Sequence, residues 1–220
     1  MGLKPSQPED PAQAATRRHL LEAASEVFAE VGFRAATVRE ICQRAEANIA
    51  AVNYHFGDKE HLYRAVLKET CRTALEKYPA DFGLPPKATP EQRLRAFVHS
   101  FLLRIFSQGP GSRHGKLMAR EMVEPTGALD AIVKEDVGPM AAVLTSIVGD
   151  LLGSSADADK KRLCGMSVVS QVLFYHHCRP VVTRLFPTMK FDAAGIEQLA
   201  EHITQFSLAA FKEISKGKKK

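Results

Sequence analysis

Polar side chains between Thr37 and Lys59 combine hydrogen-bond donors and acceptors at spacings that place several of them at helix ends. Asn53 carries an amide donor and an amide acceptor, which together fit the edge of an adenine, although the same amide can equally reach a phosphate. Tyr54 and His55 can donate to phosphate oxygens, as can Thr37 and Lys59 beside two helix N-termini. The chemistry that these groups offer is hydrogen bonding to a nucleic acid.

The elements that position these groups are short helices marked by their capping residues. Thr37 and Glu40 have the spacing of a capping box, in which hydroxyl and carboxylate satisfy reciprocal backbone N–H groups. After a three-residue turn, Asn48 can cap a second short helix, and Asp58 can cap a long helix. These two helices are predicted over residues 49–55 and 58–78.

The short helix after Asn48 has two unlike faces. Val52 and Phe56 lie four residues apart and are predicted to face the supporting helices. Small residues dominate the opposite arc, and their methyl groups allow close approach to a groove floor and packing on thymine methyls. Three helices whose later pair is joined by a tight turn form a helix-turn-helix, the second member of which enters the DNA major groove. The base-contacting residues are therefore predicted to be Ala50, Ala51 and Asn53.

The net charge of +5 and the pI of 9.0 do not by themselves indicate a nucleic-acid partner. Residues 1–78 hold eleven Lys and Arg against eleven Asp and Glu, whereas the end of the chain supplies four excess lysines at 216, 218, 219 and 220. Any DNA contact must therefore depend on where single charges lie. Arg34, Arg39 and Arg44 add charge near the predicted site, and Arg39 is expected at a phosphate.

Helical periodicity runs through nearly the whole chain, and no run alternates as a half-buried strand should, so the fold class is all-α. Residues 1–15 are polar and rich in proline and are predicted to be a flexible arm, and the first helix is expected from Thr16 to Gly32. The longest uncharged run, residues 163–178, is too short and too polar to span a bilayer, so a cytoplasmic protein without membrane contact is expected. The four separated cysteines indicate reduced thiols rather than a disulfide framework.

A proline-rich break at residues 79–90 separates this region from a second helical part. Its helices are predicted over residues 91–107, 116–124, 128–136, 139–152, 160–178 and 192–216, with a loop at 109–115 and a gap set by Gly138 and Pro139. The basic end of the chain, residues 216–220, is predicted to be a solvated tail, with phosphate or membrane-surface contact as the alternative.

The segment ATVREICQRAEANIAAVNYHFGDKEHLYRAV resembles the DNA-binding region of the TetR family of regulators, and the later EMVEPTGALD is similar to its CecR-like branch. The resemblance covers about residues 16–66 and makes Thr37, Tyr54, His55 and Lys59 phosphate contacts. It implies a homodimer in which the second domain, residues 79–215, binds a small molecule and pairs the subunits. One departure is Glu46, which stands in the turn where the family usually has glycine.

The last two long helices carry more apolar surface than the edge of a monomer should expose, which favours a four-helix dimer interface. The alternative is that they only complete the core of one subunit. The expected interface residues are Leu163, Met166, Val169, Leu173, Leu199, Ile203 and Phe206. For an effector pocket, methionine and aromatic residues mixed with isolated polar groups suggest an adaptable site for an apolar or aromatic compound. The expected lining is Phe101, Phe106, Met118, Glu121, Met122, Gln171, Phe174, Tyr175 and His176.

No metal, cofactor or catalytic site is predicted. His176, His177 and Cys178 are adjacent on a helix, so their side chains point about 100° apart and cannot converge on one ion without a break in the helix. The function expected from these features is a DNA-binding regulator, a repressor that binds a palindromic operator as a dimer and is released by a small effector. The alternative is an all-helical ligand-binding protein or enzyme that has kept the helix-turn-helix as structure only.

Overall fold

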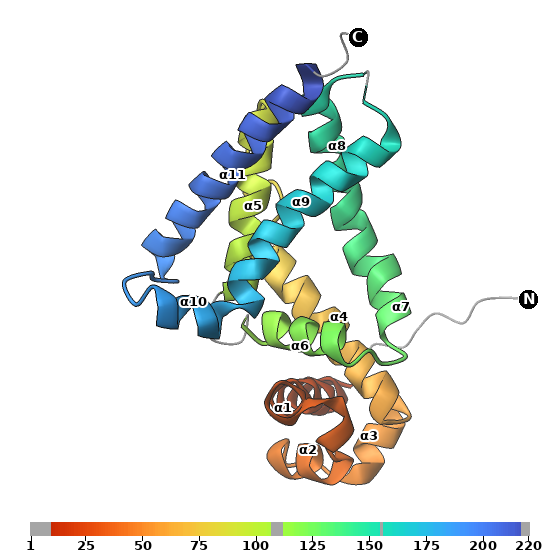
Figure 1. Cartoon of the computed structure of the whole chain (residues 1–220). Helices are drawn as coiled ribbons and strands as arrows, with labels where there is room; N and C mark the ends of the chain where they lie inside the picture. Colours follow the sequence, from red (N-terminus) through yellow and green to blue (C-terminus); the bar gives the residue numbers. More distant parts are fainter. Residues whose placement is uncertain (1–9, 107–111, 155, 217–220) are drawn as a thin grey trace, which may run out of the picture.

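The computed structural model describes residues 10–106, 112–154 and 156–216, and every regular element among them is helical (Figure 1). This confirms the all-α prediction. In chain order the helices are α1 (Pro11–Ala35), α2 (Val38–Arg44), α3 (Ile49–Phe56), α4 (Lys59–Lys77), α5 (Pro90–Phe106), α6 (Ser112–Val123), α7 (Leu129–Ile132), the π-helix η1 (Val133–Val137), α8 (Gly138–Leu152), α9 (Ala158–His177), α10 (Arg179–Leu185) and α11 (Ala193–Lys216).

Helix α1 begins at Pro11, five residues before the expected start at Thr16. The Asp10 carboxylate accepts a hydrogen bond from the Ala12 N–H at 3.1 Å, and Pro11 fits the first helical position because its missing N–H would have no partner there. Residues 11–15 are therefore helical, although the sequence assigned them to a flexible arm. The rest of that predicted arm, residues 1–9, lies outside the described residues.

Three predicted caps position the short helices and are confirmed. Thr37 accepts from the Glu40 N–H at 3.1 Å, Asn48 from the Ala51 N–H at 2.8 Å, and Asp58 from the His61 N–H at 2.8 Å. Each cap satisfies one backbone donor that a helix N-terminus leaves open. Local chemistry alone thus sets where α2, α3 and α4 begin.

Two hydrophobic cores lie at opposite ends of the molecule. The first joins α1 to α4, and it also takes Leu117 from α6, Ala128, and Ile132 from α7. The second joins α5, α8, α9 and α11. Helices α6 and α7 therefore cover the first core although they follow the proline-rich break in the chain, and Figure 1 shows α6 lying between α1 and the helices above it.

Helix α6 starts at Ser112, so the part of the predicted 109–115 loop that the structure describes is helical. Gly115 explains how α6 lies so close to α5: a Cβ there would come within 2.7 Å of the Ile105 carbonyl oxygen. Only glycine permits that approach of two backbones. Residues 107–111, which include the start of the predicted loop, are outside the described part of the chain.

The gap predicted at Gly138 and Pro139 is absent. Helix α7 continues through η1 into α8, because the π turn absorbs the backbone bond that Pro139 cannot donate. A short helix that the sequence analysis did not predict, α10, follows α9 directly, with Pro180 in its first turn. Among the described helices, none is long and apolar enough to cross a membrane.

Candidate nucleic-acid interface

Helix α3 presents its predicted outward face to solvent. Ala50 and Asn53 are exposed, and 69% of Tyr54 is exposed, whereas Val52 is completely buried in the first core. Ala51 is only half exposed and packs against that core, so of the three predicted base-contacting residues it is the least accessible. A short helix held by one buried valine and open on its other side has the shape needed to enter a groove.

The first turns of α1 lie beside α3. The Tyr54 hydroxyl donates to Oε1 of Gln13 at 3.3 Å, and the Arg17 guanidinium stands 5.4 Å from the centre of the Phe56 ring. The His55 ring is half-buried and lies edge-on to Tyr54, with 4.9 Å between ring centres. Sequence reasoning missed Gln13 because it began α1 too late, and the Asp10-Pro11 capping pair was the signal that could have placed it. Arg17 lies inside the predicted helix, but no local pattern indicates that it faces Phe56.

Thr37 and Arg39, both predicted phosphate contacts, are exposed at the start of α2. The Thr37 oxygen already accepts from the Glu40 N–H, so its O–H remains a donor toward an incoming oxygen. Arg39 makes no ion pair with any described residue. Both side chains are therefore open to solvent, and their contact with phosphates stays a prediction.

Lys59 lies differently from the prediction. Its Nζ donates to the carbonyl oxygens of Phe33 at 2.8 Å and Ala36 at 2.9 Å, and it stands 4.5 Å from the centre of the Phe33 ring. The ammonium therefore holds the chain between α1 and α2, directly before the cap at Thr37. Its backbone N–H, in the first turn of α4, is the group best placed to face a phosphate.

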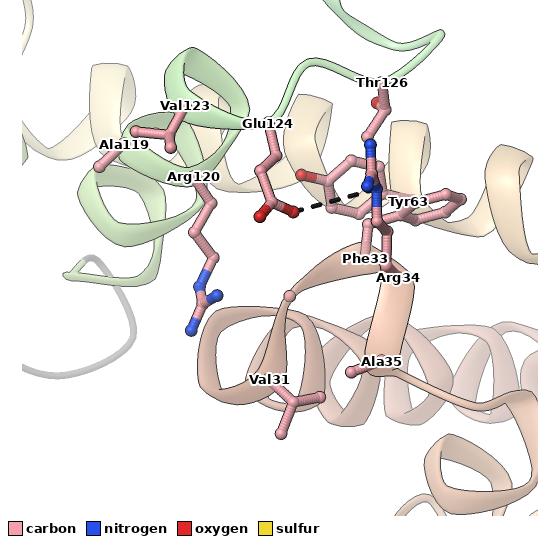
Figure 2. A pocket seen from close by; sticks show the side chains of 11 residues that line it. Val31, Phe33, Arg34, Ala35, Tyr63, Ala119, Arg120, Val123, Glu124 and Thr126 are labelled. Carbon is pink, nitrogen blue, oxygen red and sulfur yellow. Dashed lines mark ion pairs between the residues drawn. The ribbon is translucent and has the colours of Figure 1, made fainter.

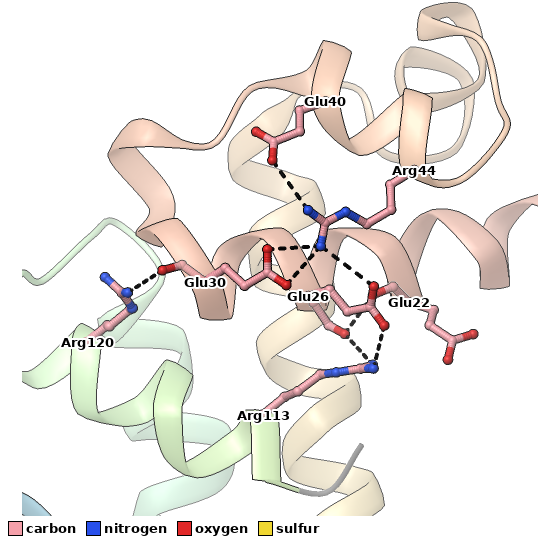
Figure 3. A network of polar contacts seen from close by, with 8 residues as sticks. Glu22, Glu26, Glu30, Glu40, Arg44, Arg113 and Arg120 are labelled. Atoms are coloured by element: carbon pink, nitrogen blue, oxygen red, sulfur yellow. Dashed lines mark hydrogen bonds and ion pairs between the residues drawn. The ribbon is translucent and has the colours of Figure 1, made fainter. Parts of the chain in front are cut away.

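Arg44 does not supply free positive charge. Its Nη1 lies 3.0 Å from Glu30 and 3.8 Å from Glu26, and its Nη2 lies 3.5 Å from Glu40 (Figure 3). The hydrogen bond from Arg44 lowers the pKa of Glu30. Since Glu40 pairs with Arg44, its carboxylate does not complete the capping box predicted with Thr37. The network ties α2 to α1 instead.

Arginines of α6 extend this network across to the second part of the chain. Nη2 of Arg113 lies 2.6 Å from Glu26, and its Nη1 donates to the Ser25 hydroxyl at 2.9 Å. Arg120 donates to the backbone carbonyl oxygen of Glu30 at 2.7 Å (Figure 3). Helix α6 is thus attached to α1 by polar contacts as well as through the shared core.

Glu121, predicted as a polar pocket residue, instead joins α6 to α4. It is completely buried, and its Oε2 accepts from the Tyr63 hydroxyl at 2.9 Å. Its Oε1 accepts from the Thr126 N–H at 2.8 Å and from the Thr126 hydroxyl at 2.9 Å. Burial and the adjacent carboxylate raise the pKa of Tyr63. Both oxygens of Glu121 are therefore satisfied inside the protein.

The EMVEPTGALD motif, residues 121–130, leads from α6 into α7 and contacts α4. We call this segment the strap. Gly127 accepts through its carbonyl from Arg64 at 3.1 Å, and a Cβ on Gly127 would come within 2.5 Å of the Glu60 carboxylate. Ala128 is completely buried in the first core. The motif is thus explained by its contacts with α4 and with the first core.

A half-open cleft of about 520 Å³ separates the end of α1 from α6 (Figure 2). Arg34 and Glu124 face each other across it, with 4.0 Å between Nε and Oε2. Gly32 bends the chain beside it with a φ of +83°, a backbone conformation that favours glycine, and a Cβ there would approach the Arg120 guanidinium to 3.0 Å. The two parts of the molecule are therefore in contact but not sealed together here.

The other predicted pocket residues do not gather at one site. Met118 packs on the first core, whereas Phe101, Phe106 and Tyr175 belong to the second. Phe106 stacks on Phe191, with 4.9 Å between ring centres, and meets His176 edge-on at 5.6 Å. The remaining three lie elsewhere: Met122 and Phe174 are exposed, and Gln171 donates to the Ser167 carbonyl and the Ser207 hydroxyl.

The predicted dimer residues divide into two groups. Leu163, Met166 and Phe206 are each 61% exposed on α9 and α11, which lie side by side at one face of the molecule (Figure 1). Val169 and Leu173 are half-buried. Leu199 and Ile203 instead lie in the second core, because α11 turns that stripe toward α5 and α8. These two residues complete the subunit and do not form a face between subunits.

Among the residues that the structure describes, no group of three or more His, Cys, Asp and Glu side chains could hold a metal ion. His176 lies against Phe106, where burial lowers its pKa, and His177 follows it edge-on at 5.4 Å. Cys178 caps α9 through its backbone N–H.

A capped three-helix unit with an open α3 face, joined by α4 to a larger helical part, defines a helix-turn-helix transcriptional regulator. Residues 20–66 match the sequence profile of bacterial regulatory proteins of the tetR family. Residues 90–211 match that of the C-terminal domain of the HTH-type transcriptional dual regulator CecR. The chain belongs to the TetR family, in the branch that carries the CecR C-terminal domain.

Known proteins resemble this chain in sequence or fold along most of its length. The dual regulator CecR of Shigella flexneri is 26% identical over 205 residues, which cover 86% of this chain and 87% of CecR. A TetR-family transcriptional regulator from Bordetella parapertussis has a similar fold, with a TM-score of 0.65, 18% identity and coverage of 87% of this chain and 93% of that one. AibR, solved in complex with isovaleryl coenzyme A and operator DNA, has a TM-score of 0.66 at 18% identity, with 87% and 97% covered. CecR and the Bordetella protein are both named as transcriptional regulators.

Proposed function

We propose that this regulator is a cytoplasmic homodimeric repressor that binds a near-palindromic operator and leaves it when a small molecule binds. The observation that carries the proposal is the open face of α3, exposed at Ala50, Asn53 and Tyr54 and flanked by the capped starts of α2 and α4. Apart from the hydrogen bond from Tyr54 to Gln13, this face is open to solvent in the part of the chain that the structure describes, and its size suits the major groove.

Asn53 and Ala50 are assigned to base contacts. Ala51 contributes its methyl group as far as its half-exposed position allows. Backbone contact is assigned to Thr37, Arg39, Tyr54 and His55, and to the N–H of Lys59 at the start of α4. These contacts are few, and residues 34–68 hold a modest surplus of six Lys and Arg over four Asp and Glu, so a salt dependence smaller than that of a strongly basic protein is expected.

The exposed apolar side chains of α9 and α11 support a two-fold interface between subunits. Leu163, Met166 and Phe206 are large and exposed, and a surface patch of this kind commonly marks a site of protein contact. A two-fold axis would place two α3 helices on one side of DNA, with half-sites one helical turn or a multiple apart.

Release by an effector requires that the second part of the chain move α4. The strap at residues 121–130 and helix α6 hold α1 and α4 through Glu121, Arg113 and Arg120. The cleft between α1 and α6 leaves space for a change of angle. An effector that favours one angle by several kcal/mol would shift the population from mostly bound to mostly released. AibR, solved with both an acyl coenzyme A and operator DNA, is a protein of similar fold in which both ligand types are present.

The experiment is a fluorescence anisotropy titration at physiological salt, with labelled DNA from upstream of the chain's own gene. A fragment that contains a palindrome should bind more tightly than the same fragment with scrambled sequence, with two chains for each DNA. Equal affinity for both fragments would refute the repressor and would favour a helical ligand-binding protein with an unused helix-turn-helix.

A further inference from the structure

An arginine that has no counter-charge among the described residues lies inside the second part of the chain. Arg104, near the end of α5, is only 6% exposed, and its Nε has no hydrogen-bond partner among the described residues. Its Nη1 donates to a thioether sulfur, Sδ of Met140, at 3.5 Å, and its guanidinium stands 5.4 Å from the centre of the Phe101 ring. A thioether is a weak acceptor, so the charge is poorly satisfied.

The charge is present at neutral pH. Burial lowers the pKa of Arg104 to about 10, which still leaves the guanidinium protonated at pH 7. A buried charge without a partner is unfavourable by several kcal/mol, and natural proteins pair almost all such groups. The arrangement is therefore incomplete within the described chain.

A second unsatisfied group lies nearby. Nδ1 of His114, in the first turns of α6, is enclosed and has no partner in the described structure. Burial first, and then the charge of Arg104, lower the pKa of His114 to about 4, so its imidazole is neutral and can donate one hydrogen bond. Gly115, the residue after His114, packs on the backbone of Ile105, the residue after Arg104. The positive charge and the neutral donor therefore lie on adjoining turns of α5 and α6, and together they suit one oxyanion.

Helices from both parts of the molecule surround this pair. Cys71 of α4 lies close enough for its charge state to interact with Arg104, and its thiol contacts Asp136 of the π turn η1. Phe101 and Met140 supply apolar surface from α5 and α8. Since Cys71 lies on α4, a group bound at Arg104 would lie near the helix that leads to α3.

We propose that Arg104 and His114 form the anchor for the carboxylate of a small organic effector whose apolar body packs against Phe101 and Met140. This inference rests on the proposed function and names the class of its effector. A carboxylate matches the planar fork of a guanidinium with two parallel hydrogen bonds and carries the single negative charge that one cation balances. A phosphate monoester would bring nearly two negative charges toward the same single cation.

The test is a thermal-shift and calorimetric titration of the full chain with octanoate and benzoate, their neutral amides, and phenyl phosphate. Wild-type protein should show a rise in Tm with a carboxylate, and none with the matched amide. Arg104→Met and Arg104→Gln should weaken carboxylate binding at least about tenfold, the effect of losing one charged hydrogen bond. Arg93→Gln is the control, since Arg93 lies on the same helix but is already paired with Asp150.

A second readout separates an anchor from a structural arginine. Without ligand, Arg104→Met should keep or raise the Tm, because a methionine removes an unpaired buried charge while filling similar space. The proposal would be overturned by no carboxylate effect on wild-type protein, by a carboxylate effect on both Arg104 variants as large as that on wild type, or by tighter binding of phenyl phosphate than of benzoate.

Operator binding is measured with the same samples, so that a failure of the carboxylate site can be distinguished from a failure of the proposed repressor function. Arg104→Met should bind the upstream palindrome as wild type does but should no longer be released by the carboxylate. A wild-type protein that binds carboxylates through Arg104 but not DNA would retain the site and refute the repressor. A wild-type protein that binds DNA but shows no ligand effect that depends on Arg104 would retain the repressor and refute the carboxylate site.

Discussion

At the scale of single residues, Glu46 stands out because its backbone is left-handed. Its φ is +52° in the turn between α2 and α3, a conformation that costs a residue with a side chain about 1–2 kcal/mol. The sequence marked this position as a departure from the glycine usual in the family. The structure gives the physical reason why glycine suits it.

We predict that Glu46→Gly stabilises the protein by about 0.5–1 kcal/mol, because relief of the strained φ exceeds the added freedom of the unfolded chain. The measurement is urea unfolding followed by circular dichroism. Glu46→Gln is the control, since it removes the charge but keeps the strain, and it should leave stability nearly unchanged. Equal gains in both variants would attribute the effect to charge.

Lys59 has a structural role that its position in the sequence did not reveal. The Lys59→Met variant should lose about 1–2 kcal/mol of stability, because two carbonyls at Phe33 and Ala36 lose their donor. DNA binding should weaken while its salt dependence remains the same.

In contrast, Arg39→Ala should lower the slope of log affinity against log salt by about 0.9, as expected for the loss of one phosphate contact. A similar decrease in slope for Lys59→Met would show that the Lys59 ammonium does contact a phosphate.

At the scale of elements, the hydrogen bond from Tyr63 to Glu121 joins α4 to α6. Burial and the Glu121 carboxylate raise the pKa of Tyr63 above its usual value of 10.0. In the unfolded chain this phenol loses its proton near pH 10, while in the folded chain it keeps it. The contribution of Tyr63 to stability is therefore complete below about pH 10 and is lost as pH rises further.

Accordingly, Tyr63→Phe should destabilise the protein by about 1–3 kcal/mol at pH 7, since it leaves a buried carboxylate oxygen without its donor. It should also make the decline in stability above pH 10 less steep. Chemical unfolding at pH 7 through 11 measures both effects. An unchanged slope above pH 10 in the variant would show that Tyr63 does not titrate differently on folding.

Elements with local signals were predictable from the sequence, and those set by packing were not. The caps at Thr37, Asn48 and Asp58 depend on neighbouring residues only, and the structure confirms them. The helical path through Pro139 depends on the π turn η1, where Glu135 pairs with Lys68 of α4, and no local pattern indicates that turn. The roles of Glu121 and Ile203 likewise depend on which helices surround them.

At the scale of the whole molecule, the division of the chain by sequence differs from its division by packing. Leu117 follows the proline-rich break at residues 79–90, yet it is fully buried in the core of α1 to α4. The amphipathic pattern of α6 showed that one face is buried, but not against which partner. This shared core joins the C-terminal part directly to the helix-turn-helix part.

Leu117→Ala should therefore lower stability by about 2–5 kcal/mol, the usual effect of a cavity at a buried leucine. Hydrogen exchange should show the lost protection in α1 to α4, and DNA affinity should fall. Leu102→Ala, an equally buried change in the second core, should instead reduce protection in α5, α8 and α11. The same exchange pattern in both variants would mean that the two cores unfold as one unit.

The most direct test of the central claim is a base-pair substitution scan of the bound upstream DNA with wild-type protein and with Asn53→Ala. The account predicts that Asn53→Ala loses about 1–3 kcal/mol of discrimination at one base pair in each half-site, at positions related by two-fold symmetry. Symmetry of the two positions would report the dimer, and their restriction to one base pair would report α3 in the major groove. The account would be contradicted if Asn53→Ala lowered the affinity for every sequence equally, or if discrimination were lost at one position and not at its symmetry-related position.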